Sequence, residues 1–346
     1  MDAIYDKPDL VIANHFLHVA HGATLAATLR EVPTVVVSHG TDMEYACAAS
    51  AVARGMARET LARTTKPVAL NETARRRLCE LLDAPAERFA VVPVGIDTDV
   101  FRSFDEPRAP RVVQVGRLLL DKGPHLTIAA FAHLLHDGLD AELELIGDGP
   151  DRTSLQALVQ AIDTGDRESA RRLLVRMADT TDRSRLLAPV AHSLFGDKGA
   201  DVLRALEGRF ASRVRFAGYL APAEVAARLR RARVCVLPSM VPECYPLTLI
   251  EAMASGCLIQ ASPLGGTAEI LAAYEREAWM MDPERPIFSL VSGIPRALRR
   301  WNANLAMDLS DRVRGRHEWR GIAPSLCRNE RTPSELPPPM RASVWS

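Results

Sequence analysis

A glycine turn that carries two cations follows a short apolar segment at residues 111–115. Gly116 and Arg117 come directly after that segment, and Lys122 follows five residues later, before a glycine and a proline. Glycine lets a backbone approach a phosphate closely, and two cations can neutralise a pyrophosphate. If 111–115 is a strand, the turn lies at the carboxyl end of an α/β sheet, where ligands bind. The spacing favours a pyrophosphate site, and a surface turn with two solvated cations is the alternative.

Two glutamates follow a second apolar segment at residues 234–237. Glu243 falls in the loop after it, and Glu251 falls inside the next predicted helix, 247–255, among apolar neighbours. A carboxylate in such surroundings is costly to bury unless something pairs with it, and the hydroxyls of a sugar or a ribose are suitable partners. These residues favour a sugar-binding or ribose-binding site, while a capping Glu243 and a salt-bridged Glu251 are the alternative.

Buried parallel strands that alternate with helices are expected to position these residues. In the first hundred residues, short β-branched runs alternate with longer segments that can supply the crossovers that parallel strands require. The predicted strands are 10–13, 34–37, 68–70 and 89–92, and the predicted helices are about 20–30, 44–64 and 72–82.

A second alternating series begins after a polar, proline-bearing stretch that ends at Pro110, so we expect two domains. Its predicted strands are 111–115, 141–146, 214–217, 234–237 and 257–261, with helices at about 124–137 and 247–255. The predicted organisation is a first domain at 1–105, a second at 106–290 with a helical insertion at about 151–209, C-terminal helices at 291–330 that return to the first domain, and a disordered tail at 331–346.

The composition is that of a folded globular protein. The 346 residues are 47% apolar and 25% charged, and 43 Lys and Arg balance 43 Asp and Glu, so nucleic acid is not expected as a partner. The six cysteines form no CxxC pair, and no segment approaches eighteen consecutive apolar residues. Because the start shows no export signal, we expect a cytoplasmic protein in which the glycosylation sequon at Asn71 is a bystander.

In chain order, the Gly116-Arg117 turn, Lys122 and two glutamates with seven residues between them resemble the donor-site signature of the retaining glycosyltransferases known as family 4. Supporting matches are 92–97 with Phe101, 145–150 and 265–269. The resemblance runs from about residue 9 to 271, interrupted by the insertion. It implies an α/β protein of GT-B fold, with two facing Rossmann-like doubly wound domains of which the first is abbreviated.

The resemblance also implies a donor site. Arg117 and Lys122 would hold the donor diphosphate beside Gly116, and Glu251 would accept the ribose hydroxyls. The donor is expected to be a UDP-, GDP- or ADP-sugar, and no metal or other cofactor is required because the two cations stabilise the charge on the departing diphosphate.

Backbone amides after Glu243 are expected to reach the donor as well. Pro246 has no N–H to give, but Leu247 and Thr248 keep theirs at the start of a helix, where anions are favoured. Tyr219 is the further residue expected beside the donor.

Two residues are expected to be catalytic. By the resemblance, Glu243 contacts the transferred sugar, and His39, in a turn after a strand, faces the same sugar. A histidine that merely occupies a turn is the alternative. The group His15, His18 and His21 is expected to be scaffold or surface rather than a zinc site, and Cys244 is expected to line the donor pocket.

The implied activity is that of a glycosyltransferase (EC 2.4 type) that moves a sugar, with retention, to a carbohydrate, lipid or small-molecule acceptor. Relatives begin with an extra strand and a glycine-rich loop, and here the resemblance starts after both. A truncated, inactive transferase and a non-catalytic nucleotide-sugar-binding partner therefore stay open as alternatives, as do a protein partner that completes the first domain and a peripheral membrane contact. Within the same fold, an epimerase or a phosphorylase is the remaining rival.

Overall fold

The computed structural model describes residues 7–178, 184–195, 199–274 and 278–327. By its internal contacts the chain divides into two compact units, which are described separately. Unit 1 comprises the chain up to Gly95, the short segment Glu243–Tyr245 and the chain from Trp319 onward; unit 2 comprises Ile96–Pro242 and Pro246–Glu318. The predicted tail at 331–346 lies outside the described residues.

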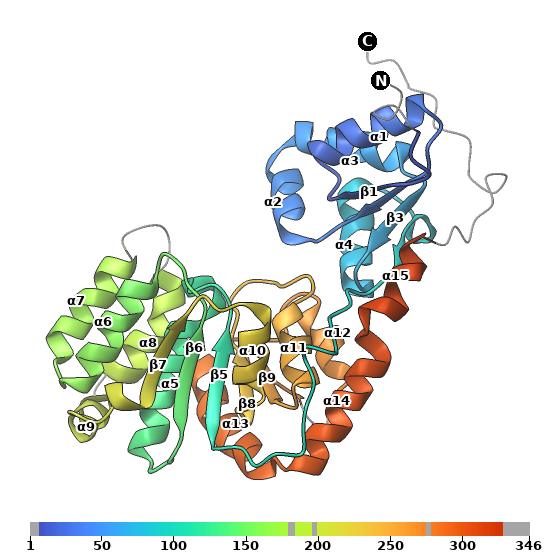
Figure 1. Ribbon diagram of the computed structural model, residues 1–346. Helices are drawn as coiled ribbons and strands as arrows, with labels where there is room; N and C mark the ends of the chain where they lie inside the picture. The colour runs from blue at the N-terminus through green and yellow to red at the C-terminus, as the bar shows by residue number, and fades with distance from the viewer. Residues whose placement is uncertain (1–6, 179–183, 196–198, 275–277, 328–346) are drawn as a thin grey trace, which may run out of the picture. The chain divides into compact units, whose positions relative to one another are not determined.

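Unit 1 is built on a parallel sheet whose described strands stand in the order β1-β2-β3-β4 (Figure 1). The strands are β1 (Val11–Asn14), β2 (Thr34–Val37), β3 (Lys66–Ala69) and β4 (Ala90–Val91). The helices are α1 (Val19–Leu29), α2 (Thr41–Ala49), α3 (Ala51–Arg63), α4 (Glu72–Leu82) and α15 (Trp319–Cys327).

Strand β2 shows how this sheet is buried on both faces. Val36 belongs to one apolar cluster, with residues of α1, α3 and α4, while Val35 and Val37 belong to another, with residues of α15. Successive side chains of a strand point to opposite faces, so a continuous run of valines fills two cores at once.

One predicted helix of unit 1 is wrong. Residues 44–64 were expected to form a single helix, but Ser50 has extended backbone angles (φ −137°, ψ 121°) and separates α2 from α3. Its hydroxyl oxygen accepts a hydrogen bond from Ala53 N–H at 3.3 Å. Serine is a preferred N-cap residue, and here the cap starts a new helix.

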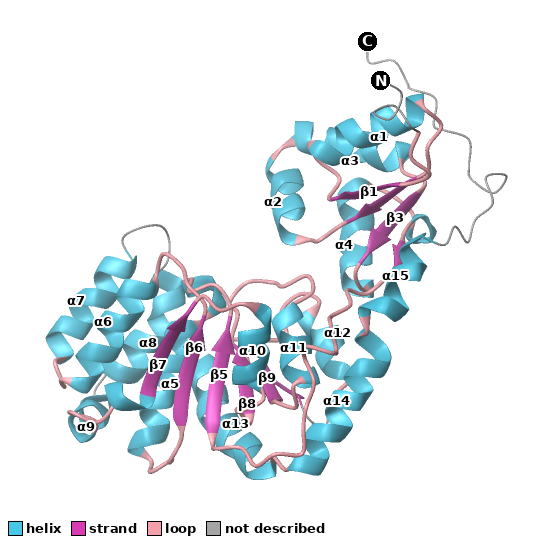
Figure 2. Cartoon of the chain, in the orientation of Figure 1, coloured by secondary structure: helices cyan, strands magenta, loops and turns pink. Residues whose placement is uncertain are grey.

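Unit 2 is built on a parallel sheet with the described strand order β10-β9-β8-β5-β6-β7 (Figure 2). The strands are β5 (Arg111–Val115), β6 (Glu142–Ile146), β7 (Val214–Gly218), β8 (Val234–Leu237), β9 (Leu258–Ala261) and β10 (Ala278–Met280). The helices are α5 (Pro124–His136), α6 (Arg152–Asp163), α7 (Arg167–Ala178), α8 (Ser184–Phe195), α9 (Gly199–Ala205), α10 (Pro222–Leu229), α11 (Leu247–Ala254), α12 (Thr267–Ala272), α13 (Pro286–Arg300) and α14 (Ala303–His317). Two parallel-sheet α/β units confirm the predicted fold class.

The stretch after Gly95 differs from the linker that its composition suggests. The division between the units falls at Gly95, before the predicted boundary at residue 105, because the polar segment that follows packs into unit 2. Ser103 N–H donates to Ser310 Oγ at 3.0 Å. Arg108 is 4% exposed, donates to Ala232 O at 2.9 Å, and lies over the ring of Trp301.

The predicted insertion between β6 and β7 is helical. Residues 151–209 contain α6 to α9, and the C-terminal helices divide between the units, with α13 and α14 in unit 2 and α15 in unit 1. In the described part of the chain, none of the helices is both long enough and apolar enough to cross a membrane.

Candidate functional site

The ends of β5 and β8 meet in the middle of the unit 2 sheet. From β5 the chain continues to β6 on one side, while β8 pairs with β5 on the other. Open α/β sheets bind ligands outside the carboxyl ends of strands at such a switch point. The segments that follow the two strands touch, because Met240 N–H donates to Asp121 O at 2.8 Å. Gly123, with φ 72°, lies so close to Pro238 that a Cβ would stand 2.9 Å from the Pro238 carbonyl carbon.

Gly116 leaves an open backbone at the end of β5. Its φ is 149°, a region that favours glycine, and a Cβ built there would meet no heavy atom within 4 Å. Arg117 is exposed and Lys122 is half-buried. The Gln114 amide donates to Lys122 O at 2.8 Å and so fixes the turn. An open glycine flanked by two cations suits a phosphate group.

Glycines also end the neighbouring strands β6 and β7. Gly147, after β6, donates its N–H to Gly218 O at 2.8 Å. A Cβ on Gly147 would stand 2.9 Å from the Gly116 carbonyl carbon, and its φ is 131°. The next residue after β7, Tyr219, has a side chain that is 81% exposed. Three adjacent strands thus end in glycines with positive φ, and Gly147 packs on Gly116 beside the exposed ring of Tyr219.

Glu251 is a half-buried carboxylate on α11. Burial raises its pKa to about 7. Among the described residues it has neither a hydrogen-bond donor nor a cation as a partner. In the first turn of the same helix, Leu247 is exposed and Thr248 is half-buried, and the N-cap residue Pro246 makes no side-chain cap. The amides of that turn and the unpaired carboxylate leave α11 suited to an anion and to hydroxyl donors.

His39 lies in unit 1, just beyond the carboxyl end of β2. Its Nε2 is 2.7 Å from Asn14 Oδ1, and the ring of His15 meets it edge-on with centroids 5.3 Å apart. Partial desolvation of the ring, together with the charge of His15, lowers the pKa of His39. The imidazole is therefore neutral near pH 7 and can form hydrogen bonds without carrying a charge.

Glu243 also belongs to unit 1, although its neighbours in the chain from Pro246 onward belong to unit 2. Gly40, beside His39, packs on Cys244, since a Cβ on Gly40 would stand 2.7 Å from Cys244 Sγ. Asn71 Nδ2 donates to Cys244 O at 2.7 Å. The residues next to His39 and Glu243 are therefore in contact.

The structure thus divides the predicted site residues between the units. His39 and Glu243 lie in unit 1, and the predicted donor-binding residues lie in unit 2: Gly116, Arg117, Lys122, Tyr219, Leu247, Thr248 and Glu251. Residues that the sequence analysis missed are Asn14, at the end of β1, and Asn71, two residues after β3. Their position at the carboxyl ends of predicted strands was the available signal. His15 was expected to be scaffold or surface, and the structure places its ring against His39.

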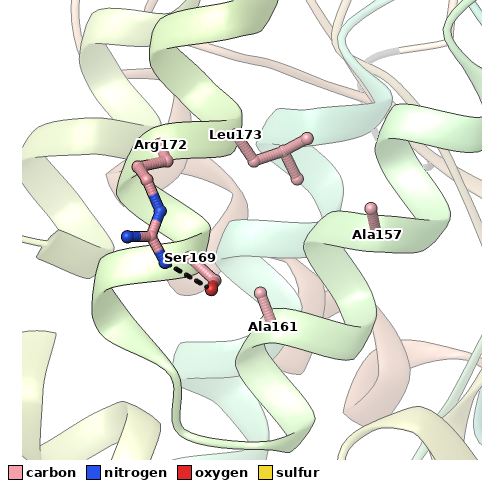
Figure 3. Close-up of a pocket in the computed structure, with 5 residues that line it drawn as sticks. All are labelled: Ala157, Ala161, Ser169, Arg172 and Leu173. Carbon is pink, nitrogen blue, oxygen red and sulfur yellow. Dashed lines mark hydrogen bonds between the residues drawn. The ribbon is translucent and has the colours of Figure 1, made fainter.

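No group of three or more His, Cys, Asp or Glu side chains within the described ranges could hold a metal ion. A hollow of about 530 Å³ lies elsewhere, between α6 and α7, and Figure 3 shows Ala157 and Ala161 facing Ser169, Arg172 and Leu173 across it. It is lined by none of the predicted site residues.

Comparison with known families assigns both halves of the chain. The family described as "Glycosyltransferase Family 4" matches residues 2–100, and families described as "Glycosyl transferases group 1" match 96–167 and 180–299, which together make up more than half of the chain. The chain belongs to the family 4 glycosyltransferases. The resemblance seen in the site motifs is thereby confirmed.

Curated relatives include members with different activities. The D-inositol 3-phosphate glycosyltransferase of Acidothermus cellulolyticus is 28% identical over 206 residues, which cover 56% of this chain and 37% of that protein. The glycogen synthase of Mycobacterium tuberculosis is 27% identical over 277 residues, covering 76% and 54%. An exopolysaccharide phosphotransferase of Streptomyces coelicolor is 26% identical over 232 residues, covering 67% and 19%. The match thus spans between about a fifth and about half of these relatives.

Solved structures of GT-B glycosyltransferases share the fold. Anabaena HepE in complex with UDP-glucose superposes with a TM-score of 0.64 at 16% identity, covering 92% of this chain and 77% of that one. Sucrose-phosphate synthase from Thermosynechococcus elongatus superposes with a TM-score of 0.62 at 21% identity, covering 92% and 72%. At these identities the likeness establishes the fold of this family 4 chain.

Proposed function

We propose that this chain transfers a sugar from a nucleoside diphosphate sugar to an acceptor, with retention of configuration at the anomeric carbon. The observation that carries the proposal is Glu251, a carboxylate with a raised pKa and no partner among the described residues, on a helix that follows the switch point of the unit 2 sheet. Ribose hydroxyls would supply the missing donors. The structural neighbour HepE, whose complex contains UDP-glucose, supports a uridine nucleotide as the first donor to test.

The proposed chemistry depends on stabilising a leaving diphosphate. Arg117 and Lys122 would neutralise the charge that grows on the diphosphate as the bond to the sugar breaks, and Gly116 would let the phosphates approach the backbone. The first-turn amides of Leu247 and Thr248 would add hydrogen bonds at a helix N-terminus. These groups bind the transition state more tightly than the substrate because the charge increases during the reaction.

The sugar would be handled by His39 and Glu243. A neutral imidazole can accept or donate a hydrogen bond to a sugar hydroxyl, and the lowered pKa of His39 keeps it neutral at pH 7. Glu243 would accept hydroxyl protons of the same sugar. The acceptor is proposed to be a carbohydrate, a lipid or a small hydroxylated molecule.

Nucleotide binding tests the donor site directly. Calorimetric titration with UDP, GDP and ADP is expected to give binding by at least one nucleotide. Arg117→Ala and Glu251→Ala should each weaken that binding roughly 10- to 100-fold, because each removes a charged hydrogen-bonding group. Arg204→Ala on α9, which removes an exposed arginine paired with Asp201, is the matched control and should bind as the wild type does. Unchanged binding in both site variants would contradict the donor-site assignment.

Product analysis tests the reaction. The chain is incubated with the preferred nucleotide sugar and an acceptor library, and the anomeric configuration of the product is read by NMR. Transfer with an α-linked donor giving an α-linked product supports the proposal. Nucleotide binding without transfer to any acceptor would instead identify a nucleotide-sugar-binding protein.

A further inference from the structure

Asn71 lies two residues after β3, immediately before α4. Its Oδ1 accepts a hydrogen bond from Ala74 N–H at 2.7 Å, which makes it the N-cap of that helix. The residue is only 4% exposed. In the sequence it is the first residue of a glycosylation sequon, but its side-chain amide is buried. The amide nitrogen, Nδ2, indicates a structural role instead.

The nitrogen of the same amide makes a second contact. Asn71 Nδ2 donates to Cys244 O at 2.7 Å, inside unit 1. Asn, Asp and Ser are about equally good N-caps. Of these three, Asn alone still has an N–H donor after its oxygen has capped the helix, because Asp is an acceptor only and the Ser hydroxyl is too short to reach further. Asn is therefore the residue type that can cap α4 and donate to Cys244 O at the same time.

The segment that receives this hydrogen bond is held from other sides as well. Cys244 packs on Gly40, where any side chain would collide with it. Cys244 and Tyr245 pack against the apolar cluster that contains Val37 and Val68. Glu243 is thus the first residue of a segment whose second residue, Cys244, packs on Gly40 and accepts a hydrogen bond from Asn71 at its carbonyl.

We propose that Asn71 is a positioning residue that fixes the backbone of Glu243 by holding the Cys244 carbonyl. The proposal rests on the proposed function, in which Glu243 contacts the transferred sugar. Groups that contact a reacting sugar lose rate when they are displaced by about 1 Å, so a freed segment lowers turnover. Nucleotide binding in unit 2 uses other residues and is expected to continue.

Two variants separate the helix-capping role of Asn71 from its hydrogen bond to Cys244 O. Asn71→Ser and Asn71→Asp both keep an oxygen that can cap α4, and both lose the donor to Cys244 O. Asn71→Ala loses both contacts and serves as the destabilised reference. The chain offers a matched control in Asn302, an exposed N-cap of α14 whose Oδ1 accepts from Leu305 N–H at 2.9 Å. Asn302→Ser and Asn302→Asp change a cap of the same type away from the proposed site.

The first readout needs no activity. In a Cys79→Ser, Cys327→Ser background, the other cysteines apart from Cys244 are buried, so a maleimide reports mainly on half-buried Cys244. We expect the labelling rate to rise roughly 3- to 10-fold in Asn71→Ser and Asn71→Asp, as for loss of one hydrogen bond that closes a segment. The Asn302 controls should label at the wild-type rate. Equal rates in all variants would overturn the proposal.

The second readout is turnover of the preferred nucleotide sugar. We expect kcat to fall roughly 10- to 100-fold in Asn71→Ser and Asn71→Asp, while the Kd for the nucleoside diphosphate stays within about twofold. Their Tm should stay above that of Asn71→Ala, because the cap is kept. If kcat, Kd and Tm fall together in proportion in all three variants, Asn71 is a structural cap only. If the wild type binds no nucleotide, the proposed function fails. The labelling result still decides whether Asn71 holds the segment that contains Cys244.

Discussion

Replacing Gly147 with alanine is expected to destabilise unit 2 by about 2–5 kcal/mol and to abolish nucleotide binding. A Cβ there would stand 2.9 Å from the Gly116 carbonyl carbon, and the φ of 131° is strained for any residue with a side chain. Overpacking costs about 1–3 kcal/mol, and the strained backbone adds about 1–2 kcal/mol. Because Gly116 would have to move, the turn expected to receive the diphosphate is displaced as well.

The measurement is thermal unfolding of Gly147→Ala beside Gly138→Ala. Gly138 follows the C-cap of α5 with φ 86°, and a Cβ there would meet nothing within 4 Å, so this control carries backbone strain without a collision. For a unit of this size, about 2–5 kcal/mol corresponds to a fall in Tm of about 4–20 °C. The control is expected to lose about 1 kcal/mol. Equal Tm values for the two variants would show that the approach of Gly147 to Gly116 is not tight.

Replacing Glu251 with glutamine is expected to stabilise the protein at pH 8 relative to the wild type, and to have little effect at pH 5. Burial raises the pKa of Glu251 from 4.5 to about 7. Between these values the folded chain keeps a proton that the unfolded chain has lost, so wild-type stability falls as the pH rises through that window. Glutamine carries no charge at any pH and removes this loss.

Urea unfolding of both proteins at pH 5 and pH 8 measures the effect. The gain of Glu251→Gln over the wild type should grow between the two pH values by up to about 3 kcal/mol, reduced by the solvent that reaches this half-buried side chain. Glu284→Gln, at an exposed position, is the control. Parallel stability curves for wild type and Glu251→Gln would contradict the prediction.

The same carboxylate links nucleotide binding to protons. Ribose hydroxyls that donate to Glu251 favour its charged form and lower its pKa. Binding near pH 6.5 is therefore expected to release a proton. Calorimetric titrations in buffers of different ionisation enthalpy would show this as a change in apparent binding enthalpy, which Glu251→Gln should remove.

Most strands could be predicted from the sequence because they are apolar runs of β-branched residues buried on both faces, as β2 and β8 are. Strand β10 could not, since its three residues, Ala278–Met280, include an exposed methionine and a partly exposed tryptophan. The break at Ser50 depends on one capping hydrogen bond inside a helix-like composition. The polar composition after Gly95 suggested a linker, but it does not reveal that Ser103 and Arg108 find buried partners far along the chain.

For the site as well, features set by neighbouring residues in the sequence could be predicted, and features set by contacts between distant residues could not. Four site candidates could be recognised from their types and order, because each depends only on the residues around it in the chain: Gly116, Arg117, Lys122 and Glu251. The placement of Glu243 in unit 1 could not, because it depends on Cys244 meeting Gly40 and Asn71, which are distant in the chain. The contact of Asn71 with Cys244 was missed for the same reason, since the local sequence of Asn71 shows only a sequon.

The order of strands in unit 2 also has a consequence for synthesis on the ribosome. Strand β5 can pair with β6 soon after both emerge, but its other edge must wait for β8, where Val112 pairs with Val234. Until then that edge is an unpaired strand of apolar residues, the kind of surface that invites wrong pairing. Glu251 is made later still, so the nascent chain carries the turn proposed to bind phosphate long before the residue proposed to recognise the ribose. We therefore expect nucleotide to help only the completed chain to fold.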